Sequence, residues 1–416
     1  MNAHPLVTTL KNLKGNARAI VLTEPVFGIP YNLFIPYASV YMLALGMTDV
    51  QIGSITSIGL IFQVLFAMVG GVITDKLGRK RTTFIFDFIS WTIPCIIWAT
   101  AQDYRYFLAA IILNSAFRIP SISWACLLVE DTPSDWLVHI FSWIYIAGLI
   151  SAFFAPIAGI FIHQYGLIPS VRGLYAFAAL MLTAKFILLN VNVSETTRGR
   201  QRMLETRTQP LLAAFKEFPE VMSLILHTPA TLRVLGLMVI LNIVNMVDGT
   251  FWSILVTQHL KIPNQNLAVF AFVRSIVLLV LYFTLVPRIS AFHFRRPFLM
   301  GLGAFWASQI LLITMPAANY PLLILSLVLE AVALASITPL LDSITALSIN
   351  PDERARIMSL LSVVVILFTA PFGWIAGQLS EINRILPFAL NLVLFVIGAV
   401  LIALTTRRDE QAEFKV

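Results

Sequence analysis

The chain has 416 residues, of which 58% are hydrophobic and only 12% are charged, and its formal net charge is +7. Soluble domains carry about 25% charged residues, so this composition excludes a soluble globular protein and indicates an integral membrane protein. The positive charge does not indicate nucleic-acid binding, because the lysines and arginines lie in short segments at the ends of apolar runs.

Twelve apolar runs follow one another along the chain. Because about 20 apolar residues in a helix span the hydrocarbon core of a bilayer, each run is long enough to cross a membrane. We therefore predict an all-α integral membrane protein whose twelve transmembrane helices cover residues 17–45, 50–74, 82–101, 105–129, 137–163, 168–192, 231–257, 265–286, 297–317, 320–345, 357–378 and 383–405.

The distribution of lysine and arginine predicts the orientation of these helices. With the N-terminus inside, the inner segments hold 21 of these residues and the outer segments hold only 4, namely Arg105, Arg172, Lys261 and Arg384. Cytoplasmic loops carry the excess of positive charge in membrane proteins. Both termini are therefore expected in the cytoplasm, and the chain is expected in the cell membrane.

A short segment, 71–81, connects the second and third predicted helices and carries one acid and four bases. Gly71 is expected to let two helix ends approach closely, and Gly78 to permit a tight turn with positive φ. At the end of the second helix, Asp75 can accept hydrogen bonds from backbone donors or pair with Arg79.

The spacing of Gly71, Asp75, Gly78, Arg79 and Lys80 resembles the signature loop between helices 2 and 3 of the major facilitator superfamily. The alternative is an ordinary positively charged cytoplasmic loop. The resemblance implies two pseudo-symmetric six-helix bundles that transport a small solute by alternating access. It also implies that helices 1, 4, 7 and 10 line a central cavity.

A weak internal repeat agrees with two related halves. Ile157-Ala-Gly159 recurs 218 residues later as Ile375-Ala-Gly377, and Arg79-Lys80 falls on Arg295-Arg296 at an offset of 216. The predicted domains are an N-terminal bundle (1–192), a cytoplasmic linker with a short amphipathic helix at 211–218 (193–230), and a C-terminal bundle with a short tail (231–416).

Asp248, Arg274 and Glu330 lie within predicted helices 7, 8 and 10, each nine or ten residues from the outer end. At about 1.5 Å per residue, all three lie roughly 14 Å deep, near the midplane. Because a charge there costs at least about 2.5–3.5 kcal/mol, we expect an ion-pair cluster. An acid in such a cluster could also carry a proton, and a purely structural ion pair is the alternative.

Polar residues recur along two of the predicted helices. Asn242, Asn245, Asp248 and Trp252 make one stripe on helix 7, and helix 4 carries a second with Asn114 and Arg118. A polar stripe on an apolar helix faces protein or water rather than lipid. The candidate substrate and proton pathway is Glu24, Asn32, Asn114, Arg118, Asn242, Asn245, Asp248, Trp252, Arg274 and Glu330.

Helix 1 carries Glu24, Asn32 and three prolines that favour bending. An acid in helix 1 facing Arg118 in helix 4 resembles the arrangement of superfamily drug/proton antiporters. Their depths differ by one or two turns, so direct pairing and separate positions both remain open. Asp87 and Lys185, on helices that face lipid or the periphery in the family, are interpreted as structural, with Lys185 reaching toward the inner surface.

Glu130 and Asp131 end helix 4 on the inner side. In the family an acid there meets the loop arginine and holds the outward-facing state, so Arg79 is expected to meet one of them. The arginine usual before helix 5 is replaced by His139, which puts the full charge relay in doubt. Helix 5 keeps only part of the glycine- and proline-rich pattern that accompanies antiporters, with Gly148, Pro156 and Gly159.

The preferred interpretation is a proton-coupled secondary transporter, with efflux of drug-like compounds or metabolites ahead of nutrient uptake or facilitated transport. A transporter-like sensor is a further alternative. An enzyme is not expected, because the six histidines and two cysteines are scattered without a ligand or nucleophile pattern, and neither a metal nor a cofactor is expected. The expected partners are a small solute, protons and the lipid bilayer, and the family resemblance implies a monomer.

Overall fold

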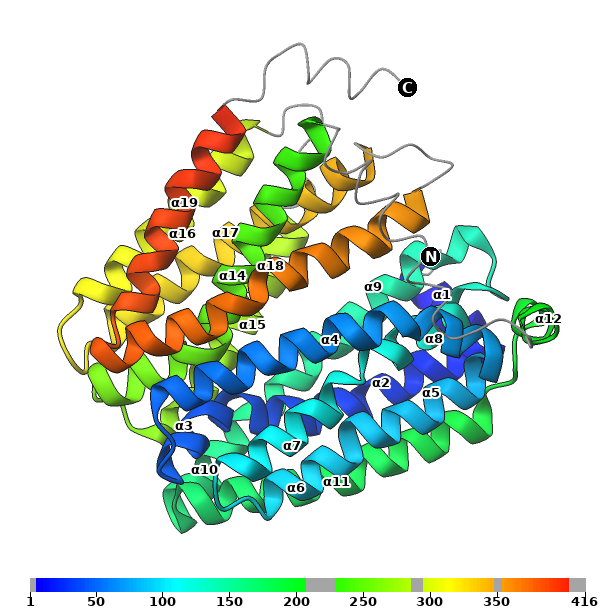
Figure 1. The fold of residues 1–416 in the computed structure, drawn as a ribbon, viewed down its shortest axis with the longest axis horizontal. Coiled ribbons are helices and arrows are strands. Elements are labelled where there is room, and N and C mark those ends of the chain that lie inside the picture. Colours follow the sequence, from blue (N-terminus) through cyan, green and yellow to red (C-terminus); the bar gives the residue numbers. More distant parts are fainter. Residues whose placement is uncertain (1–4, 207–228, 286–294, 348–353, 404–416) are drawn as a thin grey trace. The chain divides into compact units, whose positions relative to one another are not determined.

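A computed structural model describes residues 5–206, 229–285, 295–347 and 354–403 (Figure 1). Every regular element in these ranges is helical. Twelve spans among them are long and apolar enough to cross a membrane, which confirms the predicted number of transmembrane helices. The chain therefore has the all-α fold of a multi-pass membrane protein.

Several of the first six spans are interrupted helices. In chain order they are α2 (Gly15–Phe34) with η1 (Ile35–Tyr37) and α3 (Ala38–Ala44); α4 (Asp49–Leu77); α5 (Arg79–Asp87) with η2 (Phe88–Thr92) and α6 (Ile93–Ala99); α7 (Tyr104–Ser115) with α8 (Arg118–Val129); α9 (Ser134–Ser151) with η3 (Ala152–Phe154) and α10 (Ala155–Tyr165); and α11 (Leu167–Asn192).

The last six spans contain fewer breaks. They are α14 (Pro229–Ile254) with η5 (Leu255–His259); η6 (Asn264–Asn266) with α15 (Leu267–Thr284); α16 (Arg295–Thr314); α17 (Tyr320–Leu347); α18 (Arg354–Ile382); and α19 (Leu386–Ala403). Their bounds agree with the predicted ones to within a few residues at most ends, because length and hydropathy specify where a chain can cross a bilayer.

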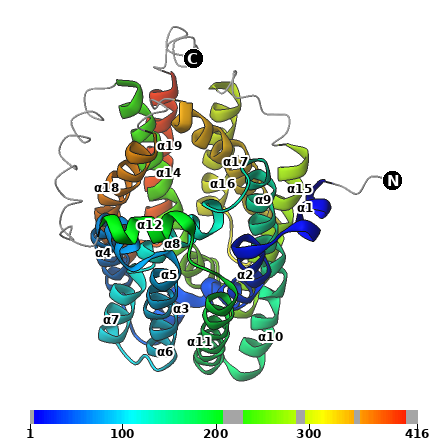
Figure 2. The same cartoon turned by 90° about the vertical axis from the view of Figure 1, so that its right-hand side faces the viewer.

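Two further helices were not predicted. One is α1 (Pro5–Asn12), ahead of the first span, and the other is α12 (Thr197–Glu205), in the arginine-rich part of the predicted linker. Figure 2 shows α12 crossing near the ends of α5 and α8. The predicted amphipathic helix at 211–218 lies outside the described residues, and the domain limits proposed from the sequence stay a prediction.

The chain divides into two compact units. Unit 1 comprises Met1–Met47 and Ile58–Lys216, and unit 2 comprises Thr48–Ser57 and Glu217–Val416. In unit 1, α2 packs against α11 and α9. Aromatic rings lie between α2 and its neighbours, and the tilted rings of Phe34 and Tyr175 have their centroids 4.8 Å apart. In unit 2, α14 packs against α18 and α19.

The breaks in the helices have local causes. Pro25 and Pro30 lie inside α2, and the helix tightens into a 3₁₀ turn at Ile35–Tyr37, which contains Pro36. The sequence predicted bending at these prolines but not the 3₁₀ turn. The third span widens into a π-helical turn at Phe88–Thr92. Such turns release backbone carbonyls, and they occur frequently at functional sites.

Glycines bring the start of α4 very close to α18 within unit 2. A Cβ at Gly53 would lie 2.4 Å from the carbonyl oxygen of Gly373 and 2.8 Å from the Cα of Gly377. We expect Gly53→Ala to destabilise the protein by about 1–3 kcal/mol, because the backbone would have to move. Thermal unfolding in detergent measures this.

The matched control for Gly53 is Gly71→Ala in the same helix. No atom of the described chain lies within 4 Å of a Cβ built at Gly71, so the expected close helix approach at Gly71 is wrong. Alanine favours a helix interior by up to about 1 kcal/mol over glycine, so Gly71→Ala should leave stability unchanged or slightly higher. Equal melting temperatures for the two variants would contradict the close packing at Gly53.

Candidate functional site

Two acids and one base meet inside unit 2. The Arg274 guanidinium on α15 lies 2.7 Å from a carboxylate oxygen of Glu330 on α17, whose side chain is buried. Asp248 on α14 interacts electrostatically with both residues. The three residues that the sequence placed at one depth therefore form one group, called the Asp248 cluster below.

Two buried amides hold Asp248, and the sequence did not single them out. Gln309 on α16 donates to the Asp248 carboxylate at 3.3 and 3.4 Å, and Asn391 on α19 donates at 3.2 Å. Both side chains are at most 1% exposed. The available signal was weak: each is the single side-chain amide of its helix, and a buried amide needs a polar partner.

The rest of the predicted stripe on α14 lies outside the Asp248 cluster. Asn242 and Asn245 are exposed, and the Asn242 amide donates to the Met238 carbonyl of its own helix at 3.0 Å. Trp252 packs edge-on against Phe270 at 6.1 Å. Of the predicted stripe, only Asp248 contacts the buried amides of Gln309 and Asn391.

Arg118 in unit 1 is held by an amide rather than by an acid. Its Nε and Nη2 atoms donate to Oε1 of Gln63 on α4 at 3.0 and 2.8 Å, and its guanidinium lies 4.9 Å from the Phe117 ring centroid. Among the described residues no ion pair joins Arg118 to Glu24. The structure therefore does not bring together the pair that the antiporter resemblance suggested, because the two side chains find different neighbours.

Glu24 instead shares its surroundings with Lys185 and Asp87. Glu24 interacts electrostatically with Lys185, and Asp87 does so with both. Lys185 is 4% exposed and Asp87 is 9% exposed, so the interpretation of Lys185 as reaching to the membrane surface is wrong. Both residues face the interior of unit 1 because α11 and α5 pack against each other there.

Two predicted asparagines bond to backbone. The Asn32 amide donates to the Gly28 carbonyl of its own helix at 2.8 Å. The Asn114 amide on α7 donates at 2.8 Å to the carbonyl of Ser90, which lies in the π-helical turn of the third span. Asn114 thus satisfies a carbonyl that this turn releases from the normal helix ladder.

At the ends of α4, α5 and α8, an ion network forms around Arg79. The Arg79 guanidinium lies 2.9 Å from Asp75, as the spacing of four residues predicts, and 3.0 Å from Glu130. Its side chain is only 4% exposed. Of the two acids at the end of the fourth span, Glu130 makes the contact, whereas Asp131 is exposed. We call Asp75, Arg79, Glu130 and their partners on and before α12 the loop network.

Residues on and before α12 complete the loop network, and sequence reasoning missed them. Arg202 pairs with Asp75 at 2.8 Å, and the Thr196 hydroxyl donates to Glu130. Hydrogen bonds to Asp75 and then to Glu205 raise the pKa of Arg202 above its usual range. The available signal was the threonine, which caps α12 by accepting from the Gly199 amide and so marks a helix start.

Glu195 caps the start of α5 from the same segment. Its carboxylate accepts from the backbone amides of Arg79 and Lys80, both at 3.0 Å, where the partial positive charge of a helix N-terminus favours an anion. Gly78 has a φ of +86°, as predicted, and a Cβ there would lie 2.5 Å from Glu195. Among the residues searched, no group of three or more metal-ligating side chains occurs.

Comparisons with known proteins agree on one fold. A family model described as the Major Facilitator Superfamily matches residues 25–291. The nucleoside transporter NupG superposes with a TM-score of 0.70 at 15% identity, covering 97% of this chain and 100% of that one. A POT family transporter in complex with 5-aminolevulinic acid gives 0.69 at 12% identity, covering 96% of each chain.

A human protein shows the same fold with a lower TM-score. The human organic anion transporter MFSD10 superposes with a TM-score of 0.57 at 17% identity, covering 96% of this chain and 100% of that one. No curated protein sequence matches the chain. The structural likenesses are below 20% identity, so they show the fold.

Proposed function

Since the chain belongs to the major facilitator superfamily and is a transporter of small solutes rather than an enzyme, we propose that protons drive its transport cycle. The proposal places the protein in the cell membrane with both termini in the cytoplasm, as the distribution of lysine and arginine favours. The family resemblance favours a monomer. Two six-helix halves would alternate between inward- and outward-facing states.

The Asp248 cluster is the observation that carries this proposal. It holds two acids and one base, so its net charge is −1 when all three are ionised and zero when one proton is bound. A net charge in an apolar membrane interior is costly, so binding of one proton changes the relative free energies of two conformations. The predicted pathway residues Asn242, Asn245 and Trp252, on the same helix as Asp248, are proposed to contact the solute.

The loop network supports a conformational switch at the inner ends of the helices. Arg79 joins α4 and α8 through Asp75 and Glu130, and α12 adds Arg202. Ion networks of this kind have discrete bonded and broken arrangements, so they can bias one state of a transport cycle. We propose that Gly71 and Gly78 belong to this switch through the backbone of the loop, and Lys80 and Asp131 through their charge, although neither of these two forms an ion pair with another described residue.

Efflux of a drug-like compound or metabolite is the preferred direction, on the partial glycine and proline pattern of the fifth span. The alternative is uptake of a nutrient. The structural likeness to a nucleoside transporter and to a peptide transporter of the POT type makes nucleosides and peptides reasonable compounds to test beside lipophilic cations, sugars and organic acids.

The test is proton movement in proteoliposomes that enclose a pH-sensitive dye. If a solute added outside acidifies the lumen, solute and protons move together, and uptake is favoured. If the solute makes the lumen alkaline, protons leave as the solute enters, and the exchange expected of an efflux system is favoured. Solute movement without any pH change would overturn proton coupling and indicate a facilitator or another ion.

Arg118 provides a separate prediction for unit 1. We expect Arg118→Ala to reduce transport to background while the protein still inserts into the membrane. Gln63 would lose its cationic partner, and the predicted pathway would lose the only cation that the fourth span contributes to it. Transport in proteoliposomes and yield of folded protein measure this. Arg105→Ala, at an exposed outer position, is the control. Normal transport by Arg118→Ala would remove the fourth span from the pathway.

A further inference from the structure

A second group of two acids and one base lies in unit 1, where Asp87 and Lys185 are buried and Glu24 is partly exposed. Glu24 comes from α2 and Asp87 from the end of α5, and both helices pack against α11, which carries Lys185. Lys185 interacts electrostatically with both acids, and the acids interact with each other. We call this group the Lys185 triad. The transport mechanism proposed above gives it no role, although the sequence placed Glu24 in the candidate substrate and proton pathway.

Lys185 is a buried cation without a close anion. Its side chain is 4% exposed, and its ammonium lies 5.4 Å from the Phe27 ring centroid and 5.2 Å from that of Phe186. Within the part of the chain that the structure describes, no carboxylate lies within 4 Å of it and no hydrogen bond to it forms. Aromatic faces stabilise a cation only in part, so Lys185 retains unused hydrogen-bond donors.

Asp87 lies where the helix geometry changes and where there is room for water. The α-helix ends at Asp87, and the π-helical turn η2 follows directly. Asp87 lines a cavity of about 10 Å³ between α5 and α11. That volume admits about one water molecule, which needs polar partners.

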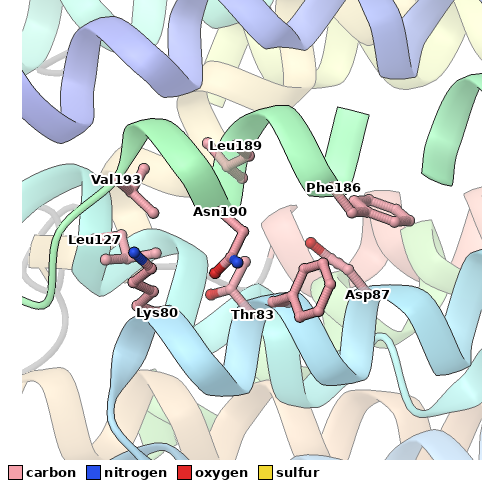
Figure 3. A pocket seen from close by; sticks show the side chains of 9 residues that line it. Lys80, Thr83, Asp87, Leu127, Phe186, Leu189, Asn190 and Val193 are labelled. Carbon is pink, nitrogen blue, oxygen red and sulfur yellow. The ribbon is translucent and has the colours of Figure 1, made fainter. Parts of the chain in front are cut away.

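The cavity extends from Asp87 toward the inner end of α5. Figure 3 shows Asn190 on α11 projecting toward Thr83 on α5, with Lys80 at one end of the cavity and Asp87 at the other. Polar side chains thus lie at intervals between the start of α5 and the buried acid. A water molecule among them can connect groups that are too far apart for direct hydrogen bonds.

The charges of the triad do not balance unless a proton is present. Two ionised carboxylates and one ammonium leave −1 in a region walled by Phe27, Phe186 and other apolar side chains, and one proton brings the sum to zero. We propose that the Lys185 triad is a proton-binding site, in which Glu24 and Asp87 share one exchangeable proton. Lys185 stabilises whichever carboxylate is ionised.

Other charged groups around the triad leave this sum unchanged. Lys80, from α5, lines the far end of the cavity near the protein surface. On α8, which packs against α5, Arg118 is held by Gln63. On α6, which packs against α11, Cys95 contributes a buried neutral thiol. At the start of α5, the buried guanidinium of Arg79 is balanced by Asp75 and Glu130. Among the described residues, Lys185 is therefore the buried cation left to balance the two acids of the triad.

The consequence of this inference depends on the proposed function: in a proton-driven transporter, a second proton site would let both units respond to pH. Proton binding itself can be tested without any transported solute. We would record infrared spectra of purified Asp248→Asn protein at neutral pH in H₂O and in D₂O, and take the difference between the two spectra. In that background the Asp248 cluster has one acid and one base and needs no proton.

The expected result follows from the charges. Asp248→Asn protein should show the carbonyl band of a protonated carboxyl group, which shifts in D₂O because the proton exchanges. Adding Asp87→Asn or Glu24→Gln should abolish the band, because the remaining acid is balanced by Lys185. Adding Lys185→Met should about double it, because both acids then stay protonated. Asp103→Asn, which alters an exposed helix cap, should leave the band unchanged.

A band that is absent at neutral pH, or that survives either acid substitution, would overturn the shared proton. The two acid variants keep the shape of the side chains, so they test the idea even if Lys185→Met fails to fold. Loss of transport in Asp248→Asn with a retained band would support both proposals. A retained band with normal transport in Asp248→Asn would reject the role of the Asp248 cluster and leave the Lys185 triad in place.

Discussion

Asp248→Asn should lose all proton-driven accumulation of solute, while exchange of solute across the membrane continues. Asparagine keeps the shape of the side chain but cannot release a proton. The remaining Glu330 and Arg274 form a neutral pair at 2.7 Å, so the charge of the cluster no longer changes during the cycle. Accumulation and exchange in proteoliposomes, measured with and without a pH gradient, separate these two activities.

Two further variants serve as comparisons for Asp248→Asn. Asp248→Glu retains a titratable group next to Gln309 and Asn391, so it should keep part of the accumulation. Glu330→Gln leaves Asp248 as the single acid opposite Arg274 and should also lose accumulation. If Asp248→Asn accumulates solute as well as the unmodified protein does, the cluster is an ion pair that only joins α14, α15 and α17.

Arg79→Met should lower the stability of unit 1 by far more than substitution of an exposed arginine does. The Arg79 guanidinium is 4% exposed and contacts Asp75 at 2.9 Å and Glu130 at 3.0 Å. Removing one partner of a buried ion pair costs about 3–5 kcal/mol, because the other partner is left uncompensated. We expect the lower end of this range, because Asp75 is 22% exposed and keeps Arg202.

Thermal unfolding in detergent measures the Arg79 effect, and turnover in proteoliposomes should fall with it. Arg200→Gln is the matched control, because it removes an exposed arginine on α12, the helix that contributes Arg202 to the loop network. If the two variants lower the melting temperature equally, the buried network contributes no more than an ordinary surface charge, and its proposed role as a switch loses its support.

The sequence alone determined the fold class and the location of the signature loop. Length and hydropathy predicted all twelve spans, because crossing a bilayer requires a run of apolar residues that can be counted along the chain. The contact of Asp75 with Arg79 was also predictable, since residues four apart on a helix face each other. Depth in the membrane was predictable as well, because each helical residue adds about 1.5 Å along the axis. Counting residues from the outer helix ends placed Asp248, Arg274 and Glu330 at one level.

Only the tertiary structure decided how each helix is turned about its axis. It placed Arg118 on Gln63 instead of near Glu24, turned Lys185 into the core, and brought Gln309 and Asn391 to Asp248. In a soluble helix, the apolar stripe reveals which side is buried. A membrane helix is apolar toward lipid and toward its neighbours alike, so its sequence specifies depth well and rotation poorly, and side-chain packing between helices makes the choice.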